Sequence, residues 1–419
     1  MSPAVLSLIA LVVALGLSMT SRINVGWLAL SFAWLIGVYA AGLRPDAVMS
    51  GFPISLFITL TGVTLLFSLA ETNGSLEALA NRAVLAARGN ARVIPIVFFA
   101  IACALSSVGP GAVSTVALLA PLAMAMGDRA GLPPFLTALM VANGANAGNL
   151  SPFSSVGVIA NNAMAKAGLT GFEGRVWFAN FIAHVLVAGA AYAAYAWTGR
   201  RLARLDAAPE TPTIALAPLS TRQRLTLLLI AGWIAGVLAL NLNLGLSAFA
   251  VAAIVLLCNA ADEAASVKRI PWGIIMMVSG VSVLIALLEK TGGMALFTEL
   301  LARTASPRTL NAVIAFVTGG ISTYSSTSGV VLPTFLPTST MLVEKVGGGD
   351  PLAVALSINV GSSLVDVSPL STIGALCVAA VADGVVARKL FRAMLIWGVA
   401  MTVVGALFCA IFAPMLASR

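Results

Sequence analysis

Charge is what this sequence has least of. Asp, Glu, Lys and Arg make up 9% of the 419 residues, whereas soluble domains carry about 25%. Hydrophobic residues make up 60%, and the mean hydropathy is +1.03. Too few polar side chains are present to cover several water-soluble domains. Because the apolar stretches are long and do not alternate with polar residues, the composition predicts an all-α polytopic membrane protein and not a barrel.

The residues of common catalytic and metal sites are also scarce. His184 is the single histidine, which argues against a histidine-based metal site or a catalytic triad. The HExxH and GxSxG motifs and a nucleotide-binding loop are missing, which argues against an enzyme and against a primary pump. Four cysteines lie in apolar segments without CxxC spacing, so free buried thiols are expected: Cys103, Cys258, Cys377 and Cys409. We therefore expect no enzyme and no cofactor.

The sequence repeats itself at an almost constant offset. Residues 53–75 match residues 271–293 at seven identical positions, with an offset of 218. Residues 144–165 match residues 361–382 at seven positions, with an offset of 217. Asn24-Val25-Gly26 recurs as Asn243-Leu244-Gly245. Shared apolar bias would not keep Ser-Pro pairs in register, so two duplicated halves are expected.

Each half divides into five membrane crossings, of which four are unbroken spans and one is a broken helix, together with one short hairpin and one polar arm. The first half, residues 1–200, has spans near 4–20, 23–41, 51–70 and 175–198, a hairpin at 93–126 and a broken helix at 133–166. The second half, residues 222–419, repeats this order after a linker at 201–221, with spans near 225–241, 243–261, 271–288 and 391–413, a hairpin at 308–343 and a broken helix at 351–382.

The two hairpins are expected to be re-entrant. An arm of about 15 residues makes about 22 Å of helix, too short for a hydrocarbon core of about 30 Å. The polar arms at 71–92 and 289–307 are expected to lie along opposite membrane faces.

An odd number of crossings in each half means that the halves insert in opposite orientations. If the arginine-rich central linker is cytoplasmic, 15 of the 23 Lys and Arg residues fall inside and 8 outside, the sense of the positive-inside rule. This rule, and not nucleic-acid binding, accounts for the net charge of +8. We expect an integral inner (cytoplasmic) membrane protein with both termini outside.

The two breaks indicate where a ligand binds. In Asn149-Leu150-Ser151-Pro152 and Asp366-Val367-Ser368-Pro369, the serine is expected to cap a new half-helix and the proline to fit its first turn. A helix N-terminus inside the bilayer suits an anion. Inverted repeats with broken helices are typical of secondary transporters, with the site at the midplane. Two such ends facing each other suit a molecule with two carboxylates.

The hairpin tips supply hydroxyls, and the breaks are expected to leave main-chain carbonyls free for a cation. Asp366 is the acidic residue expected at membrane depth, where a carboxylate is costly and usually functional. Three roles remain open for it: completing a cation site with the carbonyls of residues 361–365, carrying a coupling proton, or capping its half-helix. His184 is more simply a packed interior residue than a proton relay.

Three segments resemble the N-terminal signature of MatC-type dicarboxylate (malonate) carriers: Ser106-Ser107-Val108-Gly109-Pro110-Gly111, Asn143-Gly144-Ala145-Asn146 and Gly148-Asn149-Leu150-Ser151-Pro152-Phe153-Ser154. The wider relatives are the divalent anion:sodium symporters of the ion-transporter superfamily, although their Ser-Asn-Thr tips differ from Ser106-Ser107-Val108 and Ser326-Thr327-Ser328. The resemblance implies a homodimer, a mobile transport domain, elevator-type alternating access and cation-coupled uptake.

The combined expectation is a secondary active transporter of a small dicarboxylate (of malonate or C4 type), coupled to sodium or protons. A cation/proton antiporter of the same superfamily and, further off, a membrane-embedded enzyme are the alternatives. Expected substrate contacts are Ser106, Ser107, Asn146, Asn149, Ser151, Pro152, Ser325, Ser326, Thr327, Ser368 and Pro369. Expected cation or coupling residues are Asp366, Gly148, Gly361, Ser362 and Ser363, with a possible sodium ion at Gly148, Asn149 and Asp366. The expected partners are the dicarboxylate, the lipid bilayer and a second copy of the chain.

Overall fold

The computed structural model describes residues 1–20, 23–85, 92–109, 111–197, 218–240, 242–323, 326–381 and 383–418. Within these residues the secondary structure is helical throughout, as the composition predicted. The linker expected at 201–221 lies outside the described residues up to position 217.

The described residues of the first half form ten α-helices and one π-helical turn. They are α1 (Pro3–Thr20), α2 (Val25–Trp34), η1 (Leu35–Ala40), α3 (Pro45–Met49), α4 (Ile54–Thr72), α5 (Ser75–Leu85), α6 (Ile94–Val108), α7 (Gly111–Arg129), α8 (Pro134–Gly148), α9 (Ser155–Lys166) and α10 (Glu173–Trp197). Here α6 and α7 form the hairpin, and α8 and α9 form the broken helix.

The second half repeats this order. It comprises α11 (Thr221–Leu240), α12 (Leu244–Leu257), α13 (Glu263–Arg269), α14 (Trp272–Thr291), α15 (Gly293–Ala302), α16 (Leu310–Ser322), η3 (Thr327–Val331), α17 (Leu332–Phe335), η4 (Leu336–Thr338), α18 (Ser339–Val346), α19 (Pro351–Val365), α20 (Thr372–Ala379) and α21 (Gly384–Ala417). The second hairpin is thus α16 with η3 to α18, and the second broken helix is α19 with α20.

Equivalent helices begin with equivalent caps and make reciprocal contacts. Asn24 caps α2 and Asn243 caps α12, each with its side-chain oxygen on a main-chain N–H. Where α2 packs on α14, a Cβ at Gly280 would lie 2.2 Å from the oxygen of Gly26. Where α12 packs on α4, a Cβ at Gly62 would lie 2.4 Å from the oxygen of Gly245. The same close glycine crossing therefore occurs twice, with the roles of the halves exchanged.

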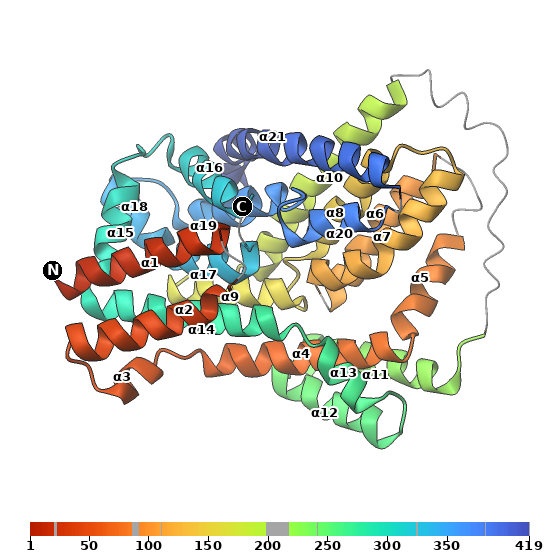
Figure 1. The fold of residues 1–419 in the computed structure, drawn as a ribbon, viewed down its shortest axis with the longest axis horizontal. Helices are drawn as coiled ribbons and strands as arrows, with labels where there is room; N and C mark the ends of the chain where they lie inside the picture. Colours follow the sequence, from red (N-terminus) through yellow and green to blue (C-terminus); the bar gives the residue numbers. More distant parts are fainter. Residues whose placement is uncertain are drawn as a thin grey trace.

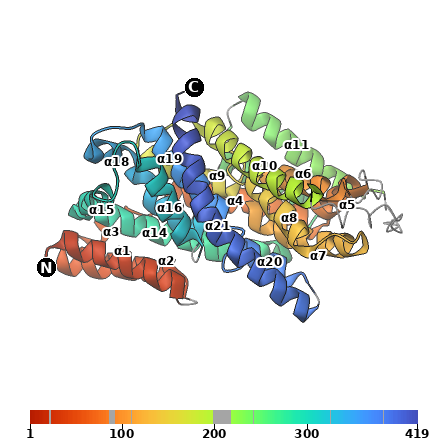
Figure 2. The ribbon, with the colours of Figure 1, turned by 90° about the horizontal axis from the view of Figure 1, so that it is seen from above.

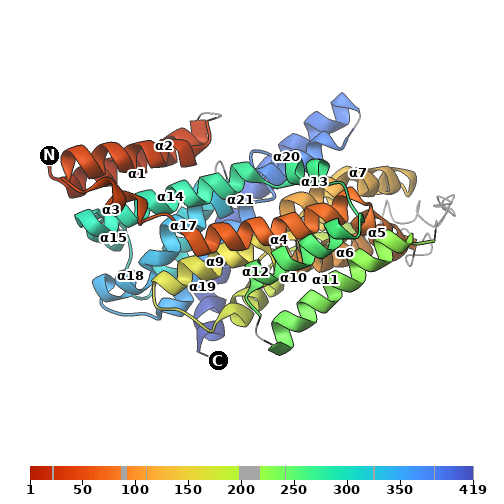
Figure 3. The same cartoon turned by 90° about the horizontal axis from the view of Figure 1, so that it is seen from below.

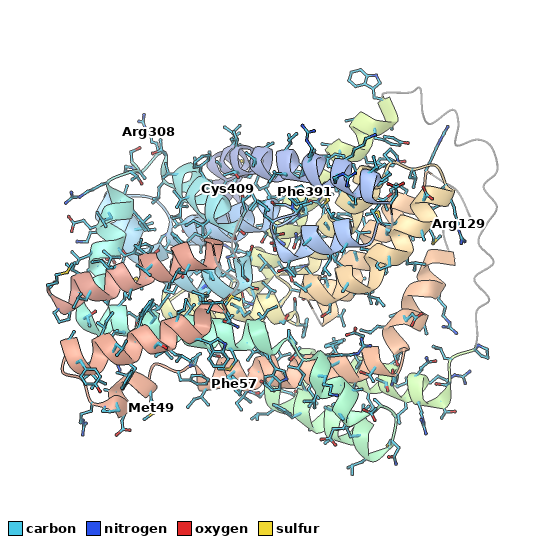
Figure 4. All side chains as sticks on the ribbon, viewed as in Figure 1. Met49, Phe57, Arg129, Arg308, Phe391 and Cys409 are labelled. Atoms are coloured by element: carbon cyan, nitrogen blue, oxygen red, sulfur yellow. The ribbon has the colours of Figure 1, made fainter. Side chains whose placement is uncertain are left out.

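The helices α4 and α14 contact each other and run in opposite directions (Figures 1 and 3). The arms α5 and α15 lie at opposite ends of the molecule in Figure 1, and the N-terminus lies at the end that holds α15. Arg129, which ends α7, and Arg308, which precedes α16, also lie at opposite ends (Figure 4). The two hairpins thus start from opposite ends, while the orientation of each half in a membrane stays a prediction.

Five helices in the described residues are long and apolar enough to cross a membrane: α4, α7, α10, α14 and α21. Shorter apolar helices, among them α6, α12, α16 and α19, complete the bundle. Along α21 the side chains of Val399, Val403, Leu407 and Ile411 are exposed at intervals of four residues, which makes an apolar stripe suited to lipid. Figure 2 shows α21 crossing the bundle on its outer side.

One length differs from the sequence expectation. The second arm of the first hairpin was expected to end at 126, too short to span. Helix α7 instead continues to Arg129 and has 19 residues, about 28 Å of helix, so it is among the five possible spans. The reason is that Gly127, Asp128 and Arg129 prolong the helix before the turn at Gly131, whose φ is +69°.

Candidate functional site

Both long helices are broken where the Ser-Pro pairs predicted. Helix α8 ends at Gly148 and α9 begins at Ser155, while α19 ends at Val365 and α20 begins at Thr372. The residues between them are buried or partly buried, apart from the exposed Leu370. Irregular main chain inside the bundle is thus surrounded by protein, as a membrane interior requires.

The capping residues, however, are not the predicted ones. Ser154 and Ser371 occupy the N-cap positions, three residues after Ser151 and Ser368. The hydroxyls of Ser151 and Ser368 instead accept the N–H two residues ahead, from Phe153 and from Leu370, each at 3.3 Å. Pro152 and Pro369 therefore lie in a tight turn before the half-helix and not in its first turn, because the serine hydroxyl closes that turn first.

The first break holds the tip of the first hairpin. Asn149 Oδ1 accepts a hydrogen bond from the N–H of Ala112 at 3.0 Å, and the N–H of Ser155 donates to the oxygen of Gly109 at 3.3 Å. The φ of Gly111 is +79°, and a Cβ there would lie 2.7 Å from Ser155 Oγ, so glycine is needed at this tip. Asn149 thus connects the hairpin tip to the broken helix.

The second break holds the tip of the second hairpin in the same way. Asp366 is the counterpart of Asn149 in the sequence repeat. Thr327 of the hairpin tip lies beside its carboxylate, and the hydroxyl of Ser371 donates to its main-chain oxygen. Ser322 Oγ contacts Thr327 Oγ1 and donates to the oxygen of Ser362 at 2.9 Å. A neutral amide in one half and a carboxylate in the other therefore occupy equivalent positions, each beside its own hairpin tip.

The two broken helices meet at equivalent positions. Asn146 Nδ2 lies 3.5 Å from the oxygen of Ser363, within hydrogen-bonding distance, and these two residues are also counterparts in the repeat. Helices α8 and α19 therefore touch at Asn146 and Ser363, one residue from each half.

The other residues expected to bind substrate take different places. Ser106 is fully buried and its hydroxyl has no hydrogen-bond partner in the described part of the chain. Ser107 is partly buried and packs against Gly148, where a Cβ would lie 2.6 Å from Ser107 Oγ. Ser326 caps η3 by accepting the N–H of Gly329 at 3.0 Å. Ser325 lies outside the described residues.

Three of the main-chain carbonyls that were expected to be free before Asp366 accept hydrogen bonds. The oxygen of Ser362 accepts from Ser322, that of Ser363 accepts from the N–H of Asp366, and that of Val365 accepts from the N–H of Ser368. Helix α19 stays regular to Val365, and its end therefore supplies partners for these carbonyls. Gly361 packs against Ala315 of α16. Among the described residues no hydrogen bond joins Gly148 or Asn149 to Asp366.

A small cavity lies between the two hairpin tips. Its volume is about 40 Å³, and its polar lining comprises Thr64, Ser114, Ser155 and Ser328. Ligand pockets usually measure about 300–1,000 Å³. The structure is therefore closed around this point.

A larger pocket of about 320 Å³ lies at the far end of α7, where α8 begins and α20 passes into α21. Asp128 and Asp383 line it. Hydrogen bonds from the N–H groups of Val386 and Val385 hold the pKa of Asp383 below its usual range, so its carboxylate remains charged. The counterparts of these two acids in the repeat are Lys345, on α18, and Lys166, at the end of α9. The corresponding place between α18 and α9 therefore has the opposite charge.

At the corresponding place a hydrogen bond joins α18 to the end of α9. Thr340 Oγ1, on α18, donates to the oxygen of Ala167, just after α9, at 2.7 Å. The equivalent residues beside the larger pocket are Ala123 and Gly384, which carry no hydroxyl. The two places therefore differ in charge and in this hydrogen bond.

Sequence reasoning placed His184 in the interior but missed Asn180, its polar neighbour on α10. Asn180 and His184 are fully buried and bond to α8 through Asn146 and Asn143. A carboxamide in an apolar span is a signal that points to such a contact. His184 is buried within the bundle.

Comparison with known proteins agrees with this architecture. Residues 1–149 match the family described as "Dicarboxylate carrier protein MatC N-terminus". The YdaH transporter of Alcanivorax borkumensis is similar in structure, with a TM-score of 0.56 and 14% identity over 88% of this chain and 89% of that one. MtrF of Neisseria gonorrhoeae, described with a class of antimetabolite efflux pumps, gives a TM-score of 0.56 and 14% identity over 98% of this chain and 94% of that one. No curated protein matches in sequence. The first 149 residues therefore resemble a dicarboxylate carrier family, and the chain shares the fold of two solved transporters.

Proposed function

We propose that this protein is a secondary active transporter of a small dicarboxylate, driven by a sodium or proton gradient. The observation that carries the proposal is the paired site: two broken helices, each tied at its break to a hairpin tip, with Asn149 and Asp366 in equivalent positions. The match of residues 1–149 to a dicarboxylate carrier family supports the substrate class.

The chemistry of the site suits a dianion. Hydroxyls and main-chain N–H groups at the ends of α9 and α20 supply hydrogen-bond donors without a buried arginine or lysine. Asp366 adds a negative charge that would repel a dicarboxylate, so a cation beside it makes binding of the dianion favourable. Substrate and cation then bind together, which is the basis of symport.

The difference between the two ends supports the proposal of alternating access. A pocket lies beside Asp128 and Asp383, whereas the Thr340–Ala167 hydrogen bond joins α18 to the end of α9 at the equivalent place. In the proposed cycle the hairpins and broken helices move as an elevator against the remaining helices. The protein is proposed to act as a homodimer in the inner membrane, with both termini outside.

A binding scan tests the substrate class. The purified protein is titrated with malonate, succinate, fumarate and matched monocarboxylates, and the thermal midpoint is recorded. We expect dicarboxylates to raise the thermal midpoint. Ser107→Ala or Ser326→Ala should lower the dicarboxylate affinity about 10- to 150-fold, the effect of losing one hydrogen bond to a charged group. Binding that is as strong for the monocarboxylates would contradict a site with two anion-binding ends.

Export is the second candidate for direction, because MtrF is described with efflux pumps and shares the fold. The same purified protein, placed in vesicles, serves to test the direction. Labelled dicarboxylate is supplied inside or outside under an imposed sodium or pH gradient, and its net movement reports the direction that this gradient drives.

A further inference from the structure

Four buried polar residues join α8 to α10 at one place. His184 Nδ1 contacts Asn143 Oδ1 at 2.9 Å, and Asn180 Nδ2 donates to the main-chain oxygen of Asn146 at 2.6 Å. All four residues have no exposed surface. Asn143 and Asn146 are three residues apart on α8, and Asn180 and His184 are four apart on α10, so each pair shares one helix face. We refer to these residues as the α8–α10 polar cluster.

The hydrogen bonds of the cluster fix the orientation of every group. Asn143 Nδ2 donates to the oxygen of Leu139 at 2.9 Å, so its Oδ1 faces His184. His184 Nδ1 must therefore carry the proton, and Nε2 of the neutral ring is an acceptor. Asn180 Nδ2 is fixed by the oxygen of Asn146, and Asn146 Nδ2 faces the oxygen of Ser363. Turning either amide over would set two oxygens against each other.

This arrangement leaves three buried acceptors. Asn146 Oδ1, Asn180 Oδ1 and His184 Nε2 have no hydrogen-bond partner among the described residues. Buried polar groups in proteins are nearly always paired with protein, water or an ion. One water molecule has two hydrogens and cannot serve three acceptors. A cation attracts lone pairs from all sides, and carboxamide oxygens are ligands that hard cations such as sodium prefer.

We propose that the α8–α10 polar cluster binds a sodium ion, with Asn146 Oδ1 and Asn180 Oδ1 as ligands. His184 Nε2 accepts a hydrogen bond from a water molecule of the ion. This site differs from the sodium site that the sequence suggested at Gly148, Asn149 and Asp366. Because Asn146 also contacts Ser363, the ion lies at the contact between the two broken helices.

The inference deepens the proposed function, and the ion's role in coupling rests on that function. The binding of sodium to the purified protein does not depend on the proposed function. An ion that holds Asn146 against α10 stabilises one packing of α8 against α19. Sodium binding would then favour one arrangement of the two breaks that bind the substrate.

The test measures saturable binding of radioactive sodium to purified protein, with choline chloride keeping the ionic strength constant. Asn180→Leu keeps the size of the side chain and removes the oxygen. We expect its sodium affinity to fall about 10- to 100-fold, the effect of losing one contact to a charged group. Asn359→Leu is the matched control: Asn359 is equally buried with an unpartnered Oδ1, but it bonds to Met164 and Ala355. The sodium affinity of this control variant should change less than about threefold.

A second variant guards against loss of folding. Asn180→Asp adds a negative charge at the same place, so it should tighten sodium binding and make the thermal midpoint depend more strongly on sodium. Wild-type protein without saturable sodium binding, or Asn180→Leu with wild-type affinity, overturns the inference. Dicarboxylate binding measured on the same samples keeps the two proposals apart. Dicarboxylate binding without sodium binding overturns the sodium site alone, whereas sodium binding without dicarboxylate binding contradicts the proposed substrate.

Discussion

Asn149 and Asp366 occupy equivalent positions in the two halves, and each contacts the tip of its own hairpin. The first contact joins an amide oxygen to a main-chain N–H, and the second joins a carboxylate to the hydroxyl of Thr327. The two halves therefore share a geometry and differ in charge. In the proposed mechanism the charge of Asp366 attracts the coupling cation.

The first prediction concerns Asp366. Asp366→Asn should weaken the ion dependence of transport and affect substrate exchange less, because exchange needs no net coupling. If the side chain at position 366 coordinates sodium, the amide oxygen of the variant still offers one ligand, and uptake keeps a weaker dependence on sodium. If the carboxylate carries the proton, accumulation driven by pH is abolished. Uptake under sodium-only and pH-only gradients separates these results, and an unchanged response to both would leave Asp366 a structural contact to Thr327.

The second prediction concerns Asn149. Asn149→Ala leaves the N–H of Ala112 without its acceptor in a buried place, which should destabilise the protein by about 1–3 kcal/mol. Asn149→Asp keeps an acceptor and adds a charge, so it should hold the tip but weaken binding of a dianion. Thermal midpoints and dicarboxylate titrations measure the two effects. Equal loss of substrate affinity in both variants would mean that charge at this position does not matter.

The third prediction tests the glycine crossings. Gly280→Ala puts a methyl group about 2.2 Å from the oxygen of Gly26 and should cost about 1–3 kcal/mol through overpacking. Gly232→Ala is the control, because nothing lies within 4 Å of its Cβ position in α11. That substitution should be neutral or stabilise by up to about 1 kcal/mol, the difference in helix propensity. Thermal unfolding of the purified variants reports both, and similar midpoints for the two would contradict the packing.

The fourth prediction concerns access at the closed end. Thr340→Val removes the hydrogen bond to Ala167, which is worth about 0.5–1.5 kcal/mol, or about 2- to 12-fold in the ratio of closed to open molecules. The labelling rate of a cysteine at Met341 by an impermeant maleimide should rise by that factor. Thr338→Val is the control, because its hydroxyl bonds only to Phe335 of the preceding turn. An unchanged rate at Met341 would show that this hydrogen bond does not hold the end closed.

The sequence was sufficient for the repeat order and for the breaks, because both depend on local signals. Ser151-Pro152 and Ser368-Pro369 mark the turns, although their hydroxyls close those turns, while Ser154 and Ser371 occupy the N-cap positions and Ser371 alone of these two accepts a cap hydrogen bond. The contacts of Asn149 with Ala112 and of Asn180 with Asn146 depend on how separate helices pack. Such register is set by the tertiary structure and is not encoded in the neighbouring residues.

The most direct test of the central claim is uptake of a radiolabelled dicarboxylate into proteoliposomes that contain the purified protein. Sodium and pH gradients are imposed separately, and unlabelled malonate, succinate and monocarboxylates compete for uptake. The proposed mechanism predicts concentrative uptake that requires one of the two gradients and is inhibited by dicarboxylates alone. Uptake that only equilibrates, whatever gradient is imposed, would contradict secondary active transport of a dicarboxylate.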